Sequence, residues 1–289
     1  MKVLETEFLQ GFVRMCHEGW LQGWHERNGG NASYRMKPEE VDQVRDDFSF
    51  DRPWKEIGAE VPELKGEYFL VTGSGKFFQN IKRDPEDSIA IAEIDEKGEK
   101  YRLVWGLING GRPTSEFPSH LMNHQVKKRV TGGAYRVVYH GHPANVIALS
   151  FILPNDGVVW TRELWESMTE CPIIFHDGIG VLPWMVCGGR DIAVKTSELM
   201  EHYDVAVWAQ HGMFCTGDTF DNCFGLFHTV DKAAGILLKV LAVTPYKRQT
   251  ITPENFRELQ TDPVFSAQFP VTLDEKYLYE KKPGASVLD

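Results

Sequence analysis

Three short apolar segments with strand character follow one another closely in the first part of the chain, at residues 68–71, 89–95 and 101–106. The second and third are joined by the turn at Glu96-Lys97-Gly98, as in a hairpin. Further along the chain, strand-like and helix-like segments alternate. We therefore predict an α/β protein with a central mixed, largely antiparallel β-sheet and helices on both sides.

The other segments fill in this outline. Apolar residues at helical spacing predict an opening helix over residues 4–27. Residues 37–66 are charged and contain proline, which predicts a helix-turn-loop excursion, and the tail from about residue 252 is polar. No shift in composition marks a linker, so residues 1–289 are predicted to form a single domain. Further strands are predicted at 32–36, 135–140, 171–176, 181–185 and 205–211, and further helices at 114–129, 145–151, 162–168, 189–203 and 219–243.

Charge and cysteine content exclude several classes of function. The net charge of −10 opposes binding to nucleic acid or to an anionic membrane surface. The five cysteines are irregularly spaced without a CxxC motif, which is typical of free thiols in a reduced compartment. No signal peptide and no apolar run of transmembrane length is visible, so a cytoplasmic location is predicted.

Histidines at strand ends are the first sign of chemistry. In "YHGHP", residues 139–143, His140 and His142 stand two apart and would point to the same side of a strand. His211 ends the strand-like "VAVWAQH" and precedes Gly212. Three imidazoles at strand ends with one open position form a pattern typical of catalytic zinc. Each histidine taken alone would more often be a packed core residue.

A carboxylate is also available in "PTSEFPSH", residues 113–120. If Ser115 caps the following helix, Glu116 lies in its first turn, where the helix dipole favours an acid. That structural role is one interpretation, and a metal ligand or general base is the other. His120 lies four residues on, on the same helical face, and could hydrogen-bond near Glu116 without binding the metal itself.

Two glycine-rich loops suggest an anion site. "TGSGK", residues 72–76, follows an apolar strand, and "RNGGN", residues 27–31, ends the opening helix. Amides freed by glycine, a hydroxyl and two Asn side chains can hold a phosphate monoester with neutral donors. Neither loop is a Walker A or dinucleotide motif, and an ordinary turn or helix cap is the alternative for each.

The motifs "SEFPSH", "HGHP" and "QHG", in this order and at these intervals, resemble the class II aldolase/adducin family. The resemblance runs from about residue 8 to about residue 251. Longer segments narrow it to family members that cleave a ketose 1-phosphate. These segments are "GWHERNGGN", "TGSGKFF", "PTSEFPSH", "VLPWM" and "FGLFHTVDKAA".

The resemblance implies an α/β fold and a homotetramer with one Zn²⁺ per subunit, its active site near a subunit interface. It implies cleavage of a sugar phosphate to dihydroxyacetone phosphate and a short aldehyde. By motif, the zinc ligands would be His140, His142, His211 and Glu116, with Glu116 leaving the metal to act as acid and base. Glu170 would approach the active site of the adjacent subunit as a second catalytic acid. The phosphate would lie against Asn28, Asn31, Ser74, Gly75 and Ser115.

Other functions remain open within the family. Pentulose-5-phosphate 4-epimerases, fuculose-phosphate aldolases and a dehydratase share the metal site and related chemistry. An adducin-like scaffold, which is not an enzyme, would keep the fold and lose the metal. The presence of all three histidines and of Glu116 favours an enzyme.

Overall fold

A computed structural model describes residues 1–247 and 249–281. The chain divides into two compact units. Unit 1 comprises Met1–His142, Val186–Glu201 and Phe214–Phe224, and unit 2 comprises Pro143–Met185, His202–Met213 and the chain from Gly225 on. The single domain over residues 1–289 stays a prediction.

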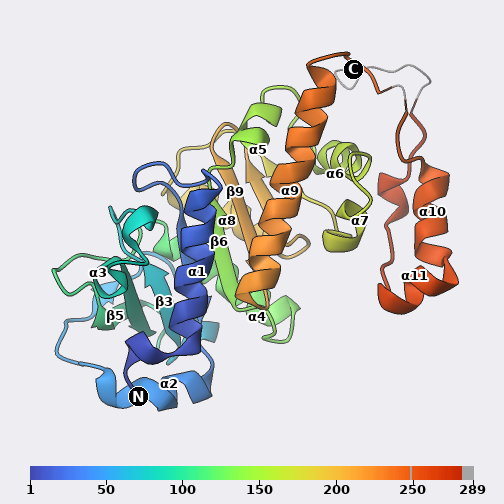
Figure 1. The fold of residues 1–289 in the computed structure, drawn as a ribbon. Helices are drawn as coiled ribbons and strands as arrows, with labels where there is room; N and C mark the ends of the chain where they lie inside the picture. Colours follow the sequence, from blue (N-terminus) through green and yellow to red (C-terminus); the bar gives the residue numbers. More distant parts are fainter. Residues whose placement is uncertain (248, 282–289) are drawn as a thin grey trace. The chain divides into compact units, whose positions relative to one another are not determined.

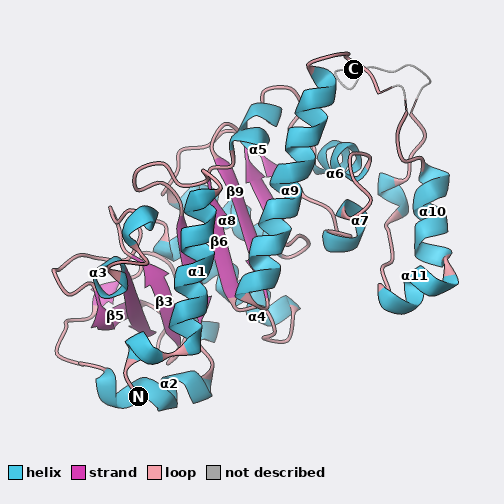
Figure 2. Ribbon diagram, in the orientation of Figure 1, coloured by secondary structure: helices cyan, strands magenta, loops and turns pink. Residues whose placement is uncertain are grey.

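The strands form one mixed sheet, largely antiparallel as predicted (Figure 2). Its order is β2-β5-β4-β3-β1-β6-β9-β8-β7. β1 pairs antiparallel with β3 and β6, β4 pairs antiparallel with β3 and β5, and β7 pairs parallel with β8. The bounds are β1 Asn31–Arg35, β2 Lys55–Glu56, β3 Tyr68–Thr72, β4 Ile89–Ile94, β5 Lys100–Gly106, β6 Val137–Gly141, β7 Gly180–Leu182, β8 Val205–Trp208 and β9 Gly212–Gly217.

Helices cover both faces of the sheet in unit 1. α1 passes close to Tyr139 of β6, because a Cβ added at Gly19 would collide with the Tyr139 hydroxyl. α4 contacts Ser33 of β1, which lies on the opposite face because neighbouring strand residues alternate. Figure 1 shows α1 crossing in front of the strands. The helices of unit 1 are α1 Glu7–Leu21, α2 Pro38–Val44, α3 Pro85–Ser88, α4 Phe117–Val130 and α8 Arg190–Met200.

Two helices of unit 1 begin or end differently from the prediction. α1 ends at Leu21, well before residue 27, because Gly23 adopts a φ of +83°. α4 begins at Phe117, so Glu116 occupies the N-cap position and Ser115 lies outside the helix. The prediction of Ser115 as N-cap was therefore wrong. Pro118 does lie in the first turn, where its missing N–H costs little.

Unit 2 is mainly helical. The predicted strand over residues 171–176 is wrong, because Cys171–Ile174 forms the short helix α7 with Pro172 in its first turn. A short apolar run does not distinguish a strand from a buried helix. The helices are α5 Ala144–Leu149, α6 Gly157–Trp165, α7 Cys171–Ile174, α9 Phe220–Leu241, α10 Pro253–Thr261 and α11 Pro263–Gln268; the first turn of α9 belongs to unit 1.

Buried charged side chains at α6 hold part of the C-terminal segment in place within unit 2. Arg162 donates to the backbone carbonyls of Tyr277 and Tyr279 at 2.8 and 2.9 Å, and Glu166 pairs with Arg162 at 2.6 Å. Lys281 contacts Glu166 at 3.0 Å. These contacts hold residues 277–281 beside α6, whereas "ASVLD", residues 285–289, lies outside the described residues. No helix in the described ranges is long and apolar enough to cross a membrane.

Candidate active site

Three adjacent strands of unit 1 bring the predicted loops to one edge of the sheet. Asn31 begins β1 and pairs with His140, near the end of β6. β3 ends at Thr72 on the other side of β1, and the Ala32 N–H donates to the Thr72 hydroxyl at 3.1 Å. Because β1 runs antiparallel to both neighbours, its start meets both of their ends.

The loop before α4 is joined to the same edge by backbone contacts. The Ser74 N–H donates to the Arg112 carbonyl and the Thr114 N–H to the Thr72 carbonyl, each at 2.9 Å. Gly73 and Pro113 form an isolated bridge. The predicted phosphate residues therefore lie on neighbouring loops. Asn31 is buried, Ser74 is partly buried, and Asn28, Gly75 and Ser115 are exposed.

The lysine of the predicted phosphate loop already has an acidic partner. Lys76, the cation of "TGSGK", forms an ion pair with Asp87 at 2.6 Å. Gly75 has a φ of +75°, a conformation that side chains other than glycine rarely adopt. The phosphate site with neutral donors stays a prediction at this loop.

Glu116 is buried between the start of β1 and the end of β6. Its Oε2 accepts a hydrogen bond from Asn31 Nδ2 at 2.8 Å and lies 3.7 Å from His140 Nε2. Burial raises the pKa of Glu116 above its ordinary value, while the Asn31 hydrogen bond and His142 lower it in part. This carboxyl can therefore hold a proton more readily than an exposed one.

The predicted histidines gather into one group. The ligand atoms of His140, His142 and His211 all lie within 4.8 Å of one another, a set that could hold a metal ion. His142 follows the end of β6, and its Nδ1 lies 2.7 Å from the Glu26 carboxylate. β8 ends at Trp208, so His211 lies in the turn before β9 and does not end the strand itself.

His25 supports the loop that carries Asn28 and Asn31. Its Nδ1–H donates to the Gly29 carbonyl at 3.1 Å, and its Nε2 accepts from the Tyr139 hydroxyl at 2.5 Å. The ring also stacks on Phe78, with centroids 3.9 Å apart. Burial lowers the pKa of His25 to about 3, so the ring is neutral and fits this pair of hydrogen bonds.

Buried neutral histidines predict acid sensitivity. Burial lowers the pKa of His25 and of His120 from 6.5 to about 3. Below pH 6.5 the unfolded chain therefore binds protons that the folded protein does not bind until about pH 3, so stability falls across this window. At pH 5 each histidine should lower the free energy of unfolding by about 2 kcal/mol relative to pH 7. Urea unfolding with a chelator present measures this.

A His25→Gln variant is the control for the acid effect. Between pH 7 and pH 5, its free energy of unfolding should show about half of the decrease that these two histidines cause. This expectation holds whatever the stability of the variant at pH 7. Equal unfolding free energies for the unmodified protein at pH 7 and pH 5 would contradict the assignment.

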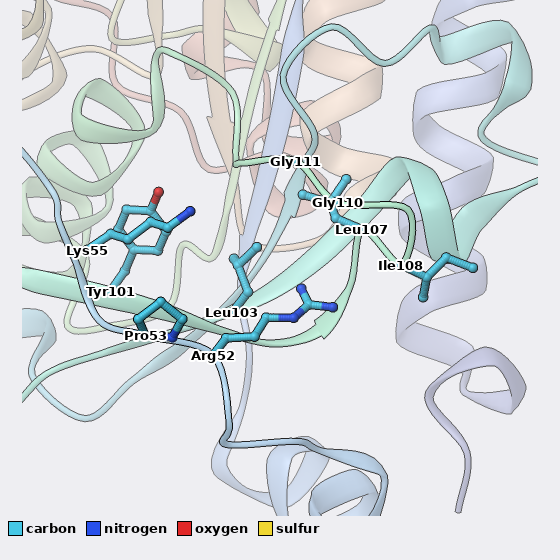
Figure 3. Close-up of a pocket in the computed structure, with 9 residues that line it drawn as sticks. All are labelled: Arg52, Pro53, Lys55, Tyr101, Leu103, Leu107, Ile108, Gly110 and Gly111. Carbon is cyan, nitrogen blue, oxygen red and sulfur yellow. The ribbon is translucent and has the colours of Figure 1, made fainter.

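Two further observations concern residues away from this edge. Glu170 occupies the N-cap position of α7 in unit 2 and is exposed. A cavity of about 250 Å³ in unit 1 is lined by Arg52, Lys55, Tyr101 and neighbouring residues (Figure 3). None of the predicted site residues lines it.

Sequence reasoning missed the partners of the site residues. Glu26 meets His142 and His25 meets Tyr139 across more than 100 positions of sequence. Asn31 was predicted to hold phosphate, yet its amide also binds Glu116. The only available signal was the place of Glu26 and His25 in "GWHERNGGN", beside the Asn residues.

The chain belongs to the class II aldolase and adducin family, because a model of the Class II Aldolase and Adducin N-terminal domain matches residues 10–238. A rhamnulose-1-phosphate aldolase of Mannheimia succiniciproducens is 46% identical over 89% of this chain and 94% of its own length. That of Pectobacterium atrosepticum is 45% identical over 87% and 92%. The structure of a sugar-phosphate aldolase from Thermotoga maritima matches with a TM-score of 0.70 and 26% identity, over 83% of this chain and 97% of that one.

Proposed function

We propose that this protein is a metal-dependent lyase. It cleaves L-rhamnulose 1-phosphate to dihydroxyacetone phosphate and L-lactaldehyde, a step of L-rhamnose catabolism. Relatives at 42–46% identity over most of the chain are named rhamnulose-1-phosphate aldolase. The observation that carries the proposal is the group of His140, His142 and His211, with the Glu116 carboxylate 3.7 Å from His140.

The donor set fits a zinc ion, one per subunit. Three imidazoles and one carboxylate are ligands that Zn²⁺ prefers, and the family is generally metal-dependent. Because Nδ1 of His142 meets Glu26, the proposal assigns Nε2 as its ligand atom. When bound, the metal supplies Lewis-acid stabilisation of the negative charge that develops on the substrate.

The chain's own residues would bind the phosphate and move protons. Asn28, Asn31, Ser74, Gly75 and Ser115 would hold the phosphate through neutral donors, which orients the C3–C4 bond at the metal group. As the C3–C4 bond breaks, the C4 hydroxyl must lose a proton to become the aldehyde carbonyl, and C3 of the dihydroxyacetone phosphate half must gain one. Glu116 would transfer the proton to C3, and Glu170 would serve the C4 hydroxyl of the aldehyde half. The burial and raised pKa of Glu116 support its role.

The proposal includes a homotetramer with the active site near a subunit interface. Glu170 is exposed on unit 2, where a neighbouring subunit could reach it, and it would serve the aldehyde half of the substrate. A cytoplasmic location is part of the same proposal and rests on the sequence alone. Protein cross-linking and sedimentation would measure the number of subunits.

Mixing the purified protein with L-rhamnulose 1-phosphate should release dihydroxyacetone phosphate, read by coupled reduction with NADH. Treatment with a chelator should abolish the reaction, and added Zn²⁺ should restore it, because the metal holds the developing charge. L-fuculose 1-phosphate and L-ribulose 5-phosphate serve as competing substrates in parallel reactions.

The competing substrates decide among the alternatives. Faster turnover of L-fuculose 1-phosphate would assign the other aldolase, and isomerisation of L-ribulose 5-phosphate alone would assign a 4-epimerase. A protein that binds no zinc and cleaves none of the three would be an adducin-like scaffold.

A further inference from the structure

A chain of buried hydrogen bonds runs from Glu116 into the interior of unit 1. Asn31 Nδ2 lies 2.8 Å from Glu116 Oε2, and Asn31 Oδ1 contacts His120 Nε2. His120 Nδ1 lies 2.7 Å from Ser33 Oγ, which lies 2.8 Å from His124 Nε2. All five side chains are buried, His120 and Ser33 completely.

The regular geometry of two elements produces this arrangement. Residues 116, 120 and 124 are spaced by four, so they share one face at and beyond the start of α4. Asn31 and Ser33 are spaced by two on β1, so they share one face of the strand. The chain of hydrogen bonds therefore alternates between a helix face and a strand face that pack together.

Both histidines in the chain are neutral. Burial lowers the pKa of His120 to about 3 and that of His124 well below its ordinary value. A neutral imidazole has one N–H donor and one acceptor nitrogen. The direction of each hydrogen bond is therefore fixed by its neighbour in the chain.

That direction is set by the carboxylate end. Glu116 accepts, so the Asn31 amide must present its NH₂ group to Glu116 and its oxygen to His120. His120 must then carry its proton on Nε2 and accept from the Ser33 hydroxyl at Nδ1. Ser33 in turn accepts from the N–H of His124. Every donor in the chain points toward Glu116.

We propose that His120 is a positioning residue, which fixes the Asn31 amide so that its NH₂ group holds one carboxylate oxygen of Glu116. This inference rests on the proposed acid–base role of Glu116. His120 itself does not touch the substrate. Without the N–H of His120, the Asn31 oxygen has no fixed partner and the amide can rotate by 180°. The Asn31 oxygen would then face the Glu116 carboxylate, and the two groups would repel each other. Ser33 and His124 hold His120 in the required tautomer.

Two substitutions distinguish the effect of the His120 N–H donor from the effect of the ring volume. His120→Phe keeps the ring volume and removes the donor, whereas His120→Gln places an amide N–H near the position of Nε2. We expect kcat of the phenylalanine variant to fall about 10- to 100-fold with KM nearly unchanged. Removing a residue that hydrogen-bonds to an active-site group, without touching the substrate, usually lowers activity by this factor. The glutamine variant should recover most of the loss.

Crystal structures of both variants give a readout that does not depend on turnover. The glutamine variant should keep the contact of Asn31 Nδ2 with Glu116 Oε2, which is 2.8 Å in the unmodified protein. In the phenylalanine variant the amide should be rotated or displaced beyond hydrogen-bond distance. If the phenylalanine variant does not fold, Ser33→Ala tests the same point, since it removes the donor that fixes the His120 tautomer.

Ser197→Ala is the matched control, because Ser197 lies on α8 and its hydrogen-bond partner Asn123 lies on α4. The Ser197 hydroxyl donates to Asn123 Oδ1 at 3.2 Å, a buried hydrogen bond outside the chain that ends at Glu116. Its loss should change stability but leave kcat unaltered. The proposal is overturned if His120→Phe keeps kcat within about twofold and keeps the Asn31–Glu116 contact, or if Ser197→Ala lowers kcat equally. If the unmodified protein cleaves no substrate, the proposed function fails, and the crystal structures still decide the orientation of Asn31.

Discussion

Replacing His142 with alanine is expected to remove zinc binding and lower kcat/KM by at least about 10³-fold, since a bound metal contributes several kcal/mol to such a reaction. His142 is only partly buried and follows the end of β6, so its removal should leave the sheet intact. Its loss leaves two of the three imidazoles that gather within 4.8 Å. Metal content by mass spectrometry and turnover of L-rhamnulose 1-phosphate measure the two effects.

An exposed histidine outside this group provides the control. His202 is exposed in unit 2, and His202→Ala should bind zinc and turn over substrate as the unmodified protein does. A His142→Ala variant with normal zinc content and normal turnover would remove His142 from the metal site.

The residues proposed to carry chemistry could be singled out from the sequence because they stand at the ends of regular elements. β1, β3 and β6 each follow a simple apolar pattern, and their ends fix Asn31, Ser74 and His140 on one edge of the sheet. The mixed sheet followed from the same patterns, since closely spaced strands must pair with near neighbours. Loops at the ends of paired strands lie side by side, so their residues come together once the strands pair.

The partners of these residues could not be predicted, because they depend on strand register and on side-chain direction. Glu26 reaches His142 only because β1 pairs with β6, which sets the loops before and after them side by side. The contact of Asn31 with Glu116 requires the start of α4 to fall at Phe117, two positions after Ser115. A difference of one or two residues at a helix start lies below what sequence patterns resolve.

The wrong strand in unit 2 and the open question of the tail have a related cause. "CPIIFH" is apolar and short, and such a run forms either a strand or a buried helical turn until its neighbours are known. The segment near Tyr277 is held by the buried side chain of Arg162 on α6, which donates to backbone carbonyls of that segment. Backbone partners leave no trace in the sequence.

Glu116→Gln is the second substitution with a large expected effect. Glutamine has the shape of glutamate and its oxygen can still accept from Asn31 Nδ2, but it cannot carry a proton between substrate atoms. We expect kcat to fall by about 10²- to 10⁴-fold, the usual contribution of a positioned acid or base. Single-turnover measurement of dihydroxyacetone phosphate release follows the step that Glu116 is proposed to serve.

The result concerns proton transfer only if the Glu116→Gln variant keeps its fold and still binds zinc through the three histidines. Zinc content and urea unfolding are therefore measured beside turnover, and the three histidines should still hold zinc although the Glu116 carboxylate is lost. Glu93→Gln is a suitable comparison, because Glu93 is a largely buried carboxylate of β4 that pairs with Arg102, away from the histidines. It should change stability without changing kcat. Near-normal cleavage by a zinc-loaded Glu116→Gln protein would show that another group moves the proton, and exposed Glu170 would then be the next residue to replace.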